Sequence, residues 1–402
     1  MRHAEDINPA ILRWARETAG LTVEEAAGKL GLKDTGKQTA VEKLVAAEDG
    51  RRAVGPSFLK QAAATYNRPL LAFYLPTPPP IGDRGVDFRP FANRSSGPRS
   101  EAMLDTLARD IRIRQQMLRE VLLDLDEVQP LLFVASVDLA ADTTHVAALI
   151  RRTLGLTMAD QIKAKTPDAL FRTLRNACGA AGIYVLLLGD LGSYHSDLGE
   201  DLFRGMAIAD DIAPVVVVND NDLPVARSFT LIHELAHVWL GATGISGPLD
   251  GLPEGDVERF CNAVASDFLL PEGSMVDFDQ EASGDVEAAL AEADRIGRSW
   301  NVSQAAVVYR AAAMHLIQPG TVREAFRILA ARWRSQRAQG REDREGGPGY
   351  YVTRRYNLGA ALLDVVDRAL RGDAVTHTKA ARLLGVAPAS VDTLLRDRPQ
   401  AA

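Results

Sequence analysis

Two histidines and a glutamate are the residues of this sequence whose types and spacing best suit catalysis. His233, Glu234 and His237 form the pattern H-E-x-x-H within residues 228–241. On an α-helix, residues four apart lie on one face, so both imidazoles can bind the same metal ion. Glu234 points to the same side of that site, where it can take a proton from a metal-bound water. The pattern therefore predicts a metal centre with a general base beside it.

The segment around this pattern predicts a buried helix, because almost every other position in it is apolar. These positions are Phe229, Leu231, Ile232, Leu235, Ala236, Val238, Trp239 and Leu240. A helix that is apolar on nearly every side lies inside a protein. Burying two histidines and a glutamate there is costly unless they have partners. A metal ion is one explanation, and ordinary hydrogen bonds within the core are the alternative.

A catalytic zinc site needs a third protein ligand and leaves its fourth position for water. No histidine follows His237 within two turns, which excludes the H-E-x-x-H-x-x-G-x-x-H arrangement. The acidic candidates downstream are Asp250, Glu254, Asp256, Glu258, Asp267 and Glu272. Glu258 lies beside the apolar stripe of a helix predicted over 256–270, and Asn262 shares its face one turn on. We therefore predict Glu258 as the third ligand and Asn262 as a polar partner behind the ligands; a surface glutamate is the alternative for Glu258.

Such a centre predicts hydrolysis of a peptide bond. Zinc lowers the pKa of its bound water to about 7 and polarises the scissile carbonyl. Glu234 then takes the proton of the water and passes it to the leaving amine. The oxyanion needs a further hydrogen-bond donor. The candidates, among which the sequence does not choose, are His195, Tyr194, Tyr309, Arg310, His315 and Arg227.

The elements that position this centre are a small sheet and several helices. Apolar runs predict strands over 182–189, 204–209 and 214–219. If 214–219 is a sheet edge, an extended peptide can add to it as a further strand. The glycine-rich residues 241–255 predict a loop. Further helices are predicted over 99–125, 143–154, 167–181, 284–299, 303–316 and 320–338, so we expect an α+β, mostly helical fold.

Helical segments flank this core on both sides. We expect a helical domain over 1–75, a Pro- and Gly-rich linker over 76–98, the catalytic domain over 99–338, a second linker over 339–353 and a helical domain over 354–402. The helices predicted within 8–70 have the outline of a helix-turn-helix DNA reader. Residues 1–70 hold 11 Lys and Arg against 9 Asp and Glu, so a helical scaffold without DNA contact is the alternative. The helices predicted near the C-terminus have a similar helix-turn-helix outline. For them we prefer a helical lid packed on the core to DNA binding.

Composition bounds the class of protein. The chain has 402 residues, of which 47% are hydrophobic, and a net charge of −7, which argues against a protein that coats nucleic acid along its whole length. The two cysteines, Cys178 and Cys261, form no C-x-x-C pair and favour a reducing compartment. The polar start of the chain predicts no signal peptide, and no apolar run is long enough for a membrane helix. We expect a cytoplasmic protein that does not contact a membrane.

Two motifs resemble those of one family of metallopeptidases. Residues 227–237, Arg-Ser-Phe-Thr-Leu-Ile-His-Glu-Leu-Ala-His, are similar to the R-x-x-F-T-x-x-H-E-x-x-H pattern of the ImmA/IrrE family. Residues 258–271 resemble its second motif, E-x-x-(A/C)-N-x-x-A-x-x-x-L-x-P, whose glutamate is the third zinc ligand and maps onto Glu258. Residues 70–76, the Phe88-Arg89 pair and the helical tail are similar to further parts of the long members, which begin with an Xre-type helix-turn-helix. The usual W-E-x-G after the recognition helix is replaced here by residues 47–50, Ala-Glu-Asp-Gly.

The resemblance implies a zincin-like core and a zinc endopeptidase that cleaves a transcriptional repressor in stress responses or mobile-element control. Mn²⁺ is the alternative metal for a site of two histidines and a glutamate. The expected partner is a protein substrate, with DNA as a second partner through residues 8–70. The alternative function is that of a DNA-binding regulator, or an antitoxin-like protein, with a vestigial peptidase domain.

Overall fold

The computed structural model describes residues 7–66, 68–79, 98–125, 128–191, 198–199, 202–246, 255–340 and 349–396. It confirms the expected α+β class, since many helices accompany one four-stranded sheet. The chain divides into two compact units, one of residues 1–110 with 191–196 and one of residues 111–190 with 197–402. Each unit has a hydrophobic core of its own. Within these described ranges, no helix combines the length and the apolar character that crossing a membrane requires.

The first unit contains short helices whose ends follow from their capping residues. They are α1 (Pro9–Glu17), α2 (Val23–Lys29), α3 (Ala40–Glu48), α4 (Pro56–Thr65) and the 3₁₀ helix η2 (Leu70–Tyr74). Thr22 and Thr39 open α2 and α3 with capping boxes, in which the threonine hydroxyl and a glutamate three residues on each accept a backbone N–H. The helices predicted within residues 8–70 are confirmed. Residues 30–39 separate α2 from α3, which is a longer interval than the 3–4-residue turn typical of a helix-turn-helix.

A buried ion pair joins α1 to α3. The Arg16 guanidinium donates to both carboxylate oxygens of Glu48, at 2.7 and 2.9 Å, and to the Leu21 carbonyl at 3.0 Å. The hydrogen bond to Glu48 raises the pKa of Arg16, although burial alone would lower it. Glu48 is only 4% exposed, so each charge depends on the other for its solvation.

Glu48→Gln is therefore expected to destabilise the first unit by about 3 kcal/mol, because it leaves the Arg16 charge buried without its partner. Hydrogen exchange of the backbone amides in α1 and α3 measures this loss in the full chain. Arg51→Met is the matched control, since it removes an exposed arginine that pairs with Asp49, and it should leave the exchange unchanged. Equal exchange rates in the parent chain and in Glu48→Gln would show that the Arg16–Glu48 pair adds nothing to the stability of the first unit.

The second unit contains most of the remaining elements. The long helix α5 (Pro98–Asp124) includes the boundary between the units. The helices that follow are α6 (Thr143–Thr153), α7 (Met158–Lys163), α8 (Pro167–Ala180), α9 (Pro224–Leu240), α10 (Asp256–Leu269), α11 (Val286–Trp300), α12 (Gln304–Ala313) and α13 (Pro319–Gly340). The 3₁₀ helices in the described part of this unit are η4 (Glu272–Met275), η5 (Gln280–Ser283) and η6 (Pro388–Ser390). The last α-helices are α14 (Tyr350–Leu358), α15 (Ala360–Arg371), α16 (His377–Leu384) and α17 (Val391–Arg396).

The sheet has the strand order β1-β3-β2-β4. Its strands are β1 (Tyr184–Leu187), β2 (Gly205–Ile208), β3 (Val215–Val218) and β4 (Gly244–Ser246). β3 runs parallel to β1 and antiparallel to β2, so it is an inner strand, and the condition under which 214–219 could take up an added peptide strand does not hold. Residues 244–246, predicted as loop, instead pair antiparallel with β2 and form the edge. Residues 244–246 were not predicted as a strand because the segment is short and glycine-rich and contains no apolar run.

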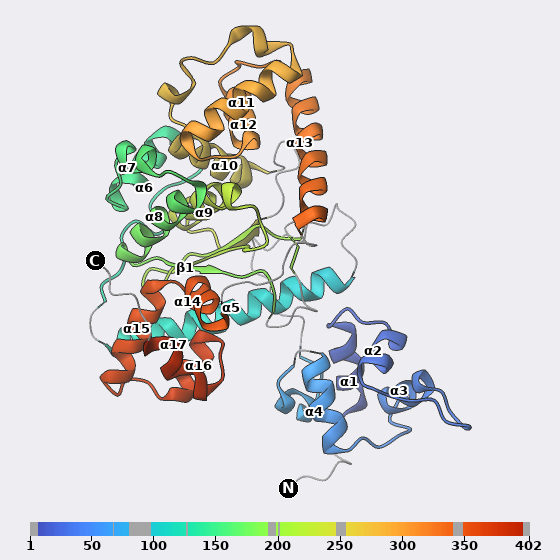
Figure 1. Cartoon of the computed structure of the whole chain (residues 1–402). Coiled ribbons are helices and arrows are strands. Elements are labelled where there is room, and N and C mark those ends of the chain that lie inside the picture. Colours follow the sequence, from blue (N-terminus) through green and yellow to red (C-terminus); the bar gives the residue numbers. More distant parts are fainter. Residues whose placement is uncertain are drawn as a thin grey trace. The chain divides into compact units, whose positions relative to one another are not determined.

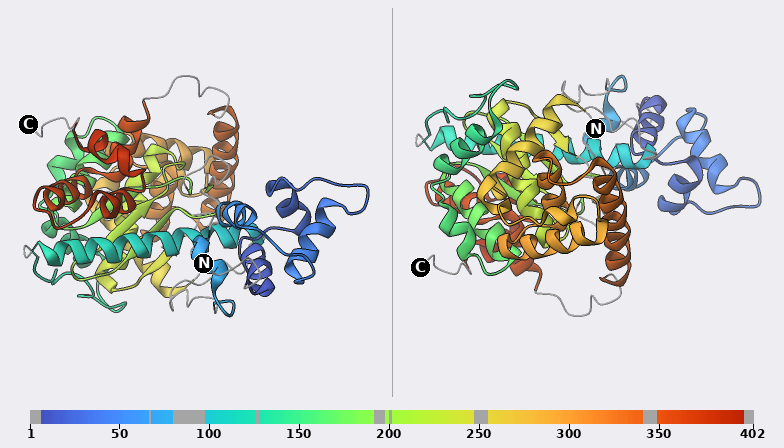
Figure 2. Two further views of the ribbon diagram at one scale, coloured as in Figure 1. Left: turned by 90° about the horizontal axis from the view of Figure 1, so that it is seen from below. Right: turned by 90° about the horizontal axis from the view of Figure 1, so that it is seen from above.

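Helices cover both faces of this sheet. α8 and α9 lie on one side of it, and α14 to α17 lie on the other, with α14 packed against β1 (Figure 1). On the far side of α9 lies α10, which contacts α9 and α6, and beyond it the group α11 to α13, gold to orange in Figure 2. α9 is therefore enclosed by the sheet, α8 and α10.

Candidate metal centre

α9 is the central helix of the second unit, and its sequence explains both ends. Pro224 occupies the first turn, where a missing N–H costs nothing. Gly241 ends the helix with φ +71°, a left-handed conformation that favours glycine, and a Cβ at this position would lie 2.6 Å from the Cβ of Ala135. Trp239 stacks on Phe133 with ring centroids 4.5 Å apart. The predicted buried helix is confirmed, because every residue from Ser228 to Trp239 is buried.

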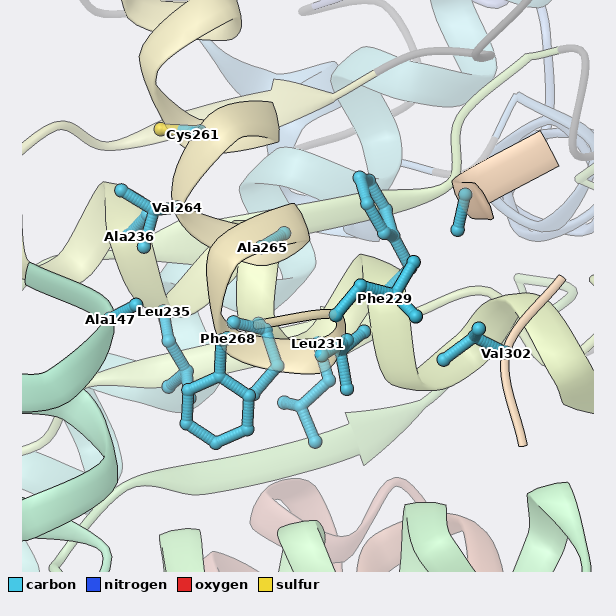
Figure 3. Close-up of a cluster of buried hydrophobic side chains, with 14 of the residues drawn as sticks. Ala147, Phe229, Leu231, Leu235, Ala236, Cys261, Val264, Ala265, Phe268 and Val302 are labelled. Carbon is cyan, nitrogen blue, oxygen red and sulfur yellow. The ribbon is translucent and has the colours of Figure 1, made fainter. Parts of the chain in front are cut away.

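α10 packs along α9 and brings its own polar residues to the two histidines. Apolar side chains of α9 and α10 fill the interface between the helices (Figure 3). They include Leu231, Leu235, Ala236, Val264, Ala265 and Phe268. Because Glu258 and Asn262 are one turn apart on α10, the packing that buries this stripe places both beside α9.

The two imidazoles and the Glu258 carboxylate converge on one point. The Nε2 atoms of His233 and His237 are 3.2 Å apart. The Glu258 carboxylate oxygens lie 3.2 Å from Nε2 of His233 and 3.4 Å from Nε2 of His237. Although burial alone would raise the pKa of Glu258, its contacts with both imidazoles hold that pKa well below its usual range. Burial likewise acts to lower the pKa of His233, and the Glu258 carboxylate raises it overall.

These separations fit the first coordination shell of a metal ion. Nitrogen and oxygen ligands at about 2.0–2.1 Å from a tetrahedral ion stand roughly 3.3–3.4 Å from one another. The observed spacings of 3.2, 3.2 and 3.4 Å match those edges. The Glu258 side chain is 34% exposed, whereas those of the histidines are almost fully buried, so the cluster opens toward solvent on the Glu258 side. The donor set, two imidazoles and a carboxylate, suits a divalent transition metal.

Asn262 fixes the orientation of one imidazole. Its Oδ1 lies 2.8 Å from Nδ1 of His233, which fits Nδ1–H donating to the amide oxygen and leaves the Nε2 lone pair directed at the cluster. On the His237 side, the Ser246 hydroxyl lies 3.5 Å from Nε2, and no residue that the structure describes hydrogen-bonds Nδ1. Asn262 therefore lies where the sequence places it, behind a candidate ligand.

Glu234 is fully buried beside the cluster, and its carboxylate has no hydrogen-bond partner among the described residues. Burial raises its pKa, while the nearby His237 and His233 imidazoles and the Ser246 hydroxyl lower it in part. Within the described part of the chain, neither carboxylate oxygen completes a hydrogen bond of good geometry. A buried polar group without a partner costs free energy. This carboxylate is therefore placed for an exchangeable partner, such as a water or a substrate.

Sequence reasoning missed three residues of this site. A Cβ on Gly205 of β2 would lie 2.3 Å from Oε1 of Glu234, so only glycine leaves room for that carboxylate. Ser246 belongs to the strand that was predicted as loop. The Cys261 sulfur and one ring nitrogen of each of His233 and His237 lie within 4.8 Å of one another, although the sequence indicated only a core residue at this position. A glycine inside a predicted strand is the one signal of close backbone approach that the sequence offers here.

The other predicted candidates have different surroundings. Arg227 donates to the carbonyls of Asp220 and Asp222 and holds the turn before α9. Tyr309 lies on α12, where burial and the charge of Asp267 raise its pKa. Arg310 pairs with Asp267, and His315 lies just after α12 with φ +58°. Asp256 pairs with Arg259, and Glu272 is exposed at the start of η4. Asp250, Glu254, Tyr194 and His195 lie outside the described residues.

The comparisons with known proteins point to one family. Residues 179–312 match the family model of peptidase M78, described as the IrrE N-terminal-like domain. Neither the curated proteins nor the solved structures gave a match to this chain. The matched segment contains the sheet, α9 and α10 and thus the whole cluster around His233 and His237. Residues 179–312 are therefore similar to the IrrE N-terminal-like domain of peptidase M78.

Proposed function

We propose that this chain is a zinc-dependent endopeptidase in which His233, His237 and Glu258 hold the metal and Glu234 is the general base. The main support is the convergence of two imidazole nitrogens and one carboxylate at 3.2–3.4 Å, the spacing of a tetrahedral shell. When bound, the metal supplies a Lewis acid that makes water more acidic and polarises a peptide carbonyl.

The residues around the metal site orient a ligand and transfer the proton. Asn262 keeps His233 in the tautomer whose Nε2 faces the site. Glu234 accepts a proton from the attacking water and returns it to the leaving amine. Burial raises its pKa, which suits a group that must both take and release a proton near neutral pH.

The edge of the sheet suggests how a substrate is held. β3 is an inner strand, so an added peptide strand cannot pair with it. α14 packs against β1, and no other described strand pairs with the outer side of β4. Ser246 of β4 lies beside His237. We therefore assign an extended peptide segment to the outer side of β4, where main-chain hydrogen bonds would place its carbonyl near the site.

The proposed substrate is a transcriptional repressor, as the resemblance to the ImmA/IrrE family implies. The test is to incubate the full chain with a repressor encoded beside it, with and without a chelator. Cleavage that stops on chelation and returns with zinc is the expected result. Cleavage that persists without metal would overturn the mechanism. Salt-dependent binding to promoter DNA with no cut peptide bond would instead favour the regulator with a vestigial peptidase domain.

Gly205→Ala is expected to lower the rate of peptide hydrolysis about 100-fold while the bound metal stays the same. The added Cβ would overlap Glu234, whose Oε1, Cδ and Cγ lie at 2.3, 2.7 and 2.8 Å from that position, and a displacement of the base by about 1 Å costs this much. Metal content and single-turnover cleavage measure the two effects separately. Gly320→Ala in α13 is the matched control, because its Cβ would meet nothing within 4 Å. An unchanged rate in Gly205→Ala would contradict a catalytic need for the Glu234 carboxylate at this position.

A further inference from the structure

Cys261 lies on α10 one turn after Glu258, in the interface with α9. Its side chain is fully buried and is drawn there with its apolar neighbours (Figure 3). Its surroundings nevertheless differ from those of an ordinary core thiol. The Cys261 sulfur and one nitrogen of each of His233 and His237 lie within 4.8 Å of one another. Glu258 and Glu234 are also close enough for their charges to act on the thiol.

The spacing brings this thiol near the coordination shell. A tetrahedral zinc ion with nitrogen at about 2.0–2.1 Å and sulfur at about 2.3 Å separates the two ligand atoms by roughly 3.6 Å. The sulfur lies within 4.8 Å of one ring nitrogen of each histidine, so a shift of roughly an ångström brings it to a ligand's separation from both. Because Cys261 and Glu258 are three residues apart on one helix, they approach the histidines from the same side.

We propose that Cys261 is a fourth protein ligand of the metal in the resting enzyme, beside His233, His237 and Glu258. This inference rests on the proposed function, since it concerns the same metal centre. The thiol ligates as a thiolate, and its proton passes to solvent when the metal binds.

Two consequences follow from a thiolate in this shell. Two histidines and a glutamate alone accept Mn²⁺ as well as Zn²⁺, but a soft sulfur donor favours zinc, so Cys261 sets the choice of metal. Four protein ligands also make a closed shell, which is the arrangement of structural zinc, whereas catalysis needs an open position. Cys261 must therefore leave the metal when the substrate arrives, which keeps the resting enzyme inactive.

Cobalt spectroscopy of the full chain tests the inference without measuring activity. The parent chain, Cys261→Ala and Cys178→Ala are each loaded with Co²⁺. Cys178 is the matched control, because it is the other of the two cysteines in the sequence and is buried in α8. We expect the visible bands of tetrahedral cobalt in all three proteins. The near-ultraviolet charge-transfer band from thiolate to cobalt should appear in the parent and in Cys178→Ala and be absent from Cys261→Ala.

Competition between Zn²⁺ and Mn²⁺ gives a second readout. Cys261→Ala should bind zinc at least about tenfold more weakly, while its affinity for Mn²⁺ stays the same. Visible cobalt bands in the parent chain without a charge-transfer band would overturn the role of Cys261 and leave the metal centre standing. This outcome does not depend on whether any variant folds. A parent chain that binds no cobalt would overturn the proposed metal centre itself.

Discussion

Glu234→Gln is expected to abolish peptide hydrolysis while the metal remains bound. The amide has the size of the carboxylate but cannot accept a proton from water, and the loss of a general base lowers rates by about 10²–10⁴-fold. The proposed ligands His233, His237, Glu258 and Cys261 are unchanged, so the metal content should stay at that of the parent chain. Single-turnover cleavage and metal analysis of the same preparation check both parts.

The same substitution has an expected effect on stability. Burial raises the pKa of Glu234, so the folded state holds a proton more tightly than the unfolded state does. Above both pKa values the ionised carboxylate then destabilises the metal-free fold, and a neutral amide removes that penalty. The metal-free variant should therefore be as stable as its parent or more so near neutral pH. Active-site residues commonly exchange stability for function in this way.

Glu258→Gln is the control that separates a ligand from a base. It should lose bound metal and activity together, because an amide is a poorer ligand than a carboxylate for a divalent ion. A Glu234→Gln variant that cleaves within tenfold of the parent rate would contradict the assignment, since a general base contributes at least about 10²-fold.

The sequence predicts the two helices of the site because their signals are local. The H-E-x-x-H spacing and the apolar stripe of 256–270 each depend on residues within one helix, and both predicted helices are confirmed. The strands are also found, since runs such as 214–219 are buried on both faces and so continuously apolar.

The order of the strands in the sheet cannot be predicted from such local signals. β3 comes after β2 in the chain but inserts between β1 and β2, and an apolar run contains no information on its neighbours. For the same reason, Arg227 and Tyr309 qualified as candidates by residue type alone. Arg227 donates to the turn just before α9, and the surroundings of Tyr309 depend on Asp267, a residue distant in sequence on the neighbouring helix.

Arg175→Met is expected to release the last helices of the second unit from the sheet. The Arg175 guanidinium is buried between α8, β1 and α14 and donates to the carbonyl of Val185, at 3.0 and 2.7 Å, and to those of Tyr356 and Asn357. Burial lowers the pKa of Arg175 to about 10. Each carbonyl left without a donor costs about 1–3 kcal/mol, so the loss should reach about 3 kcal/mol or more. Hydrogen exchange over residues 350–396 measures it.

Two further variants make this prediction specific. Arg172→Met changes an exposed arginine one turn earlier on the same helix and should leave the exchange over 350–396 unchanged. Gly359→Ala should loosen the same contact from the opposite side, because Gly359 has φ +79° and its added Cβ would lie 2.8 Å from the Arg175 guanidinium. If the amides of α14 stay as protected in Arg175→Met as in the parent chain, the apolar contacts of α14 and α15 alone keep residues 350–396 packed on the sheet. If Gly359→Ala and Arg175→Met both speed the hydrogen exchange over residues 350–396, Arg175 is what attaches these helices to α8 and β1.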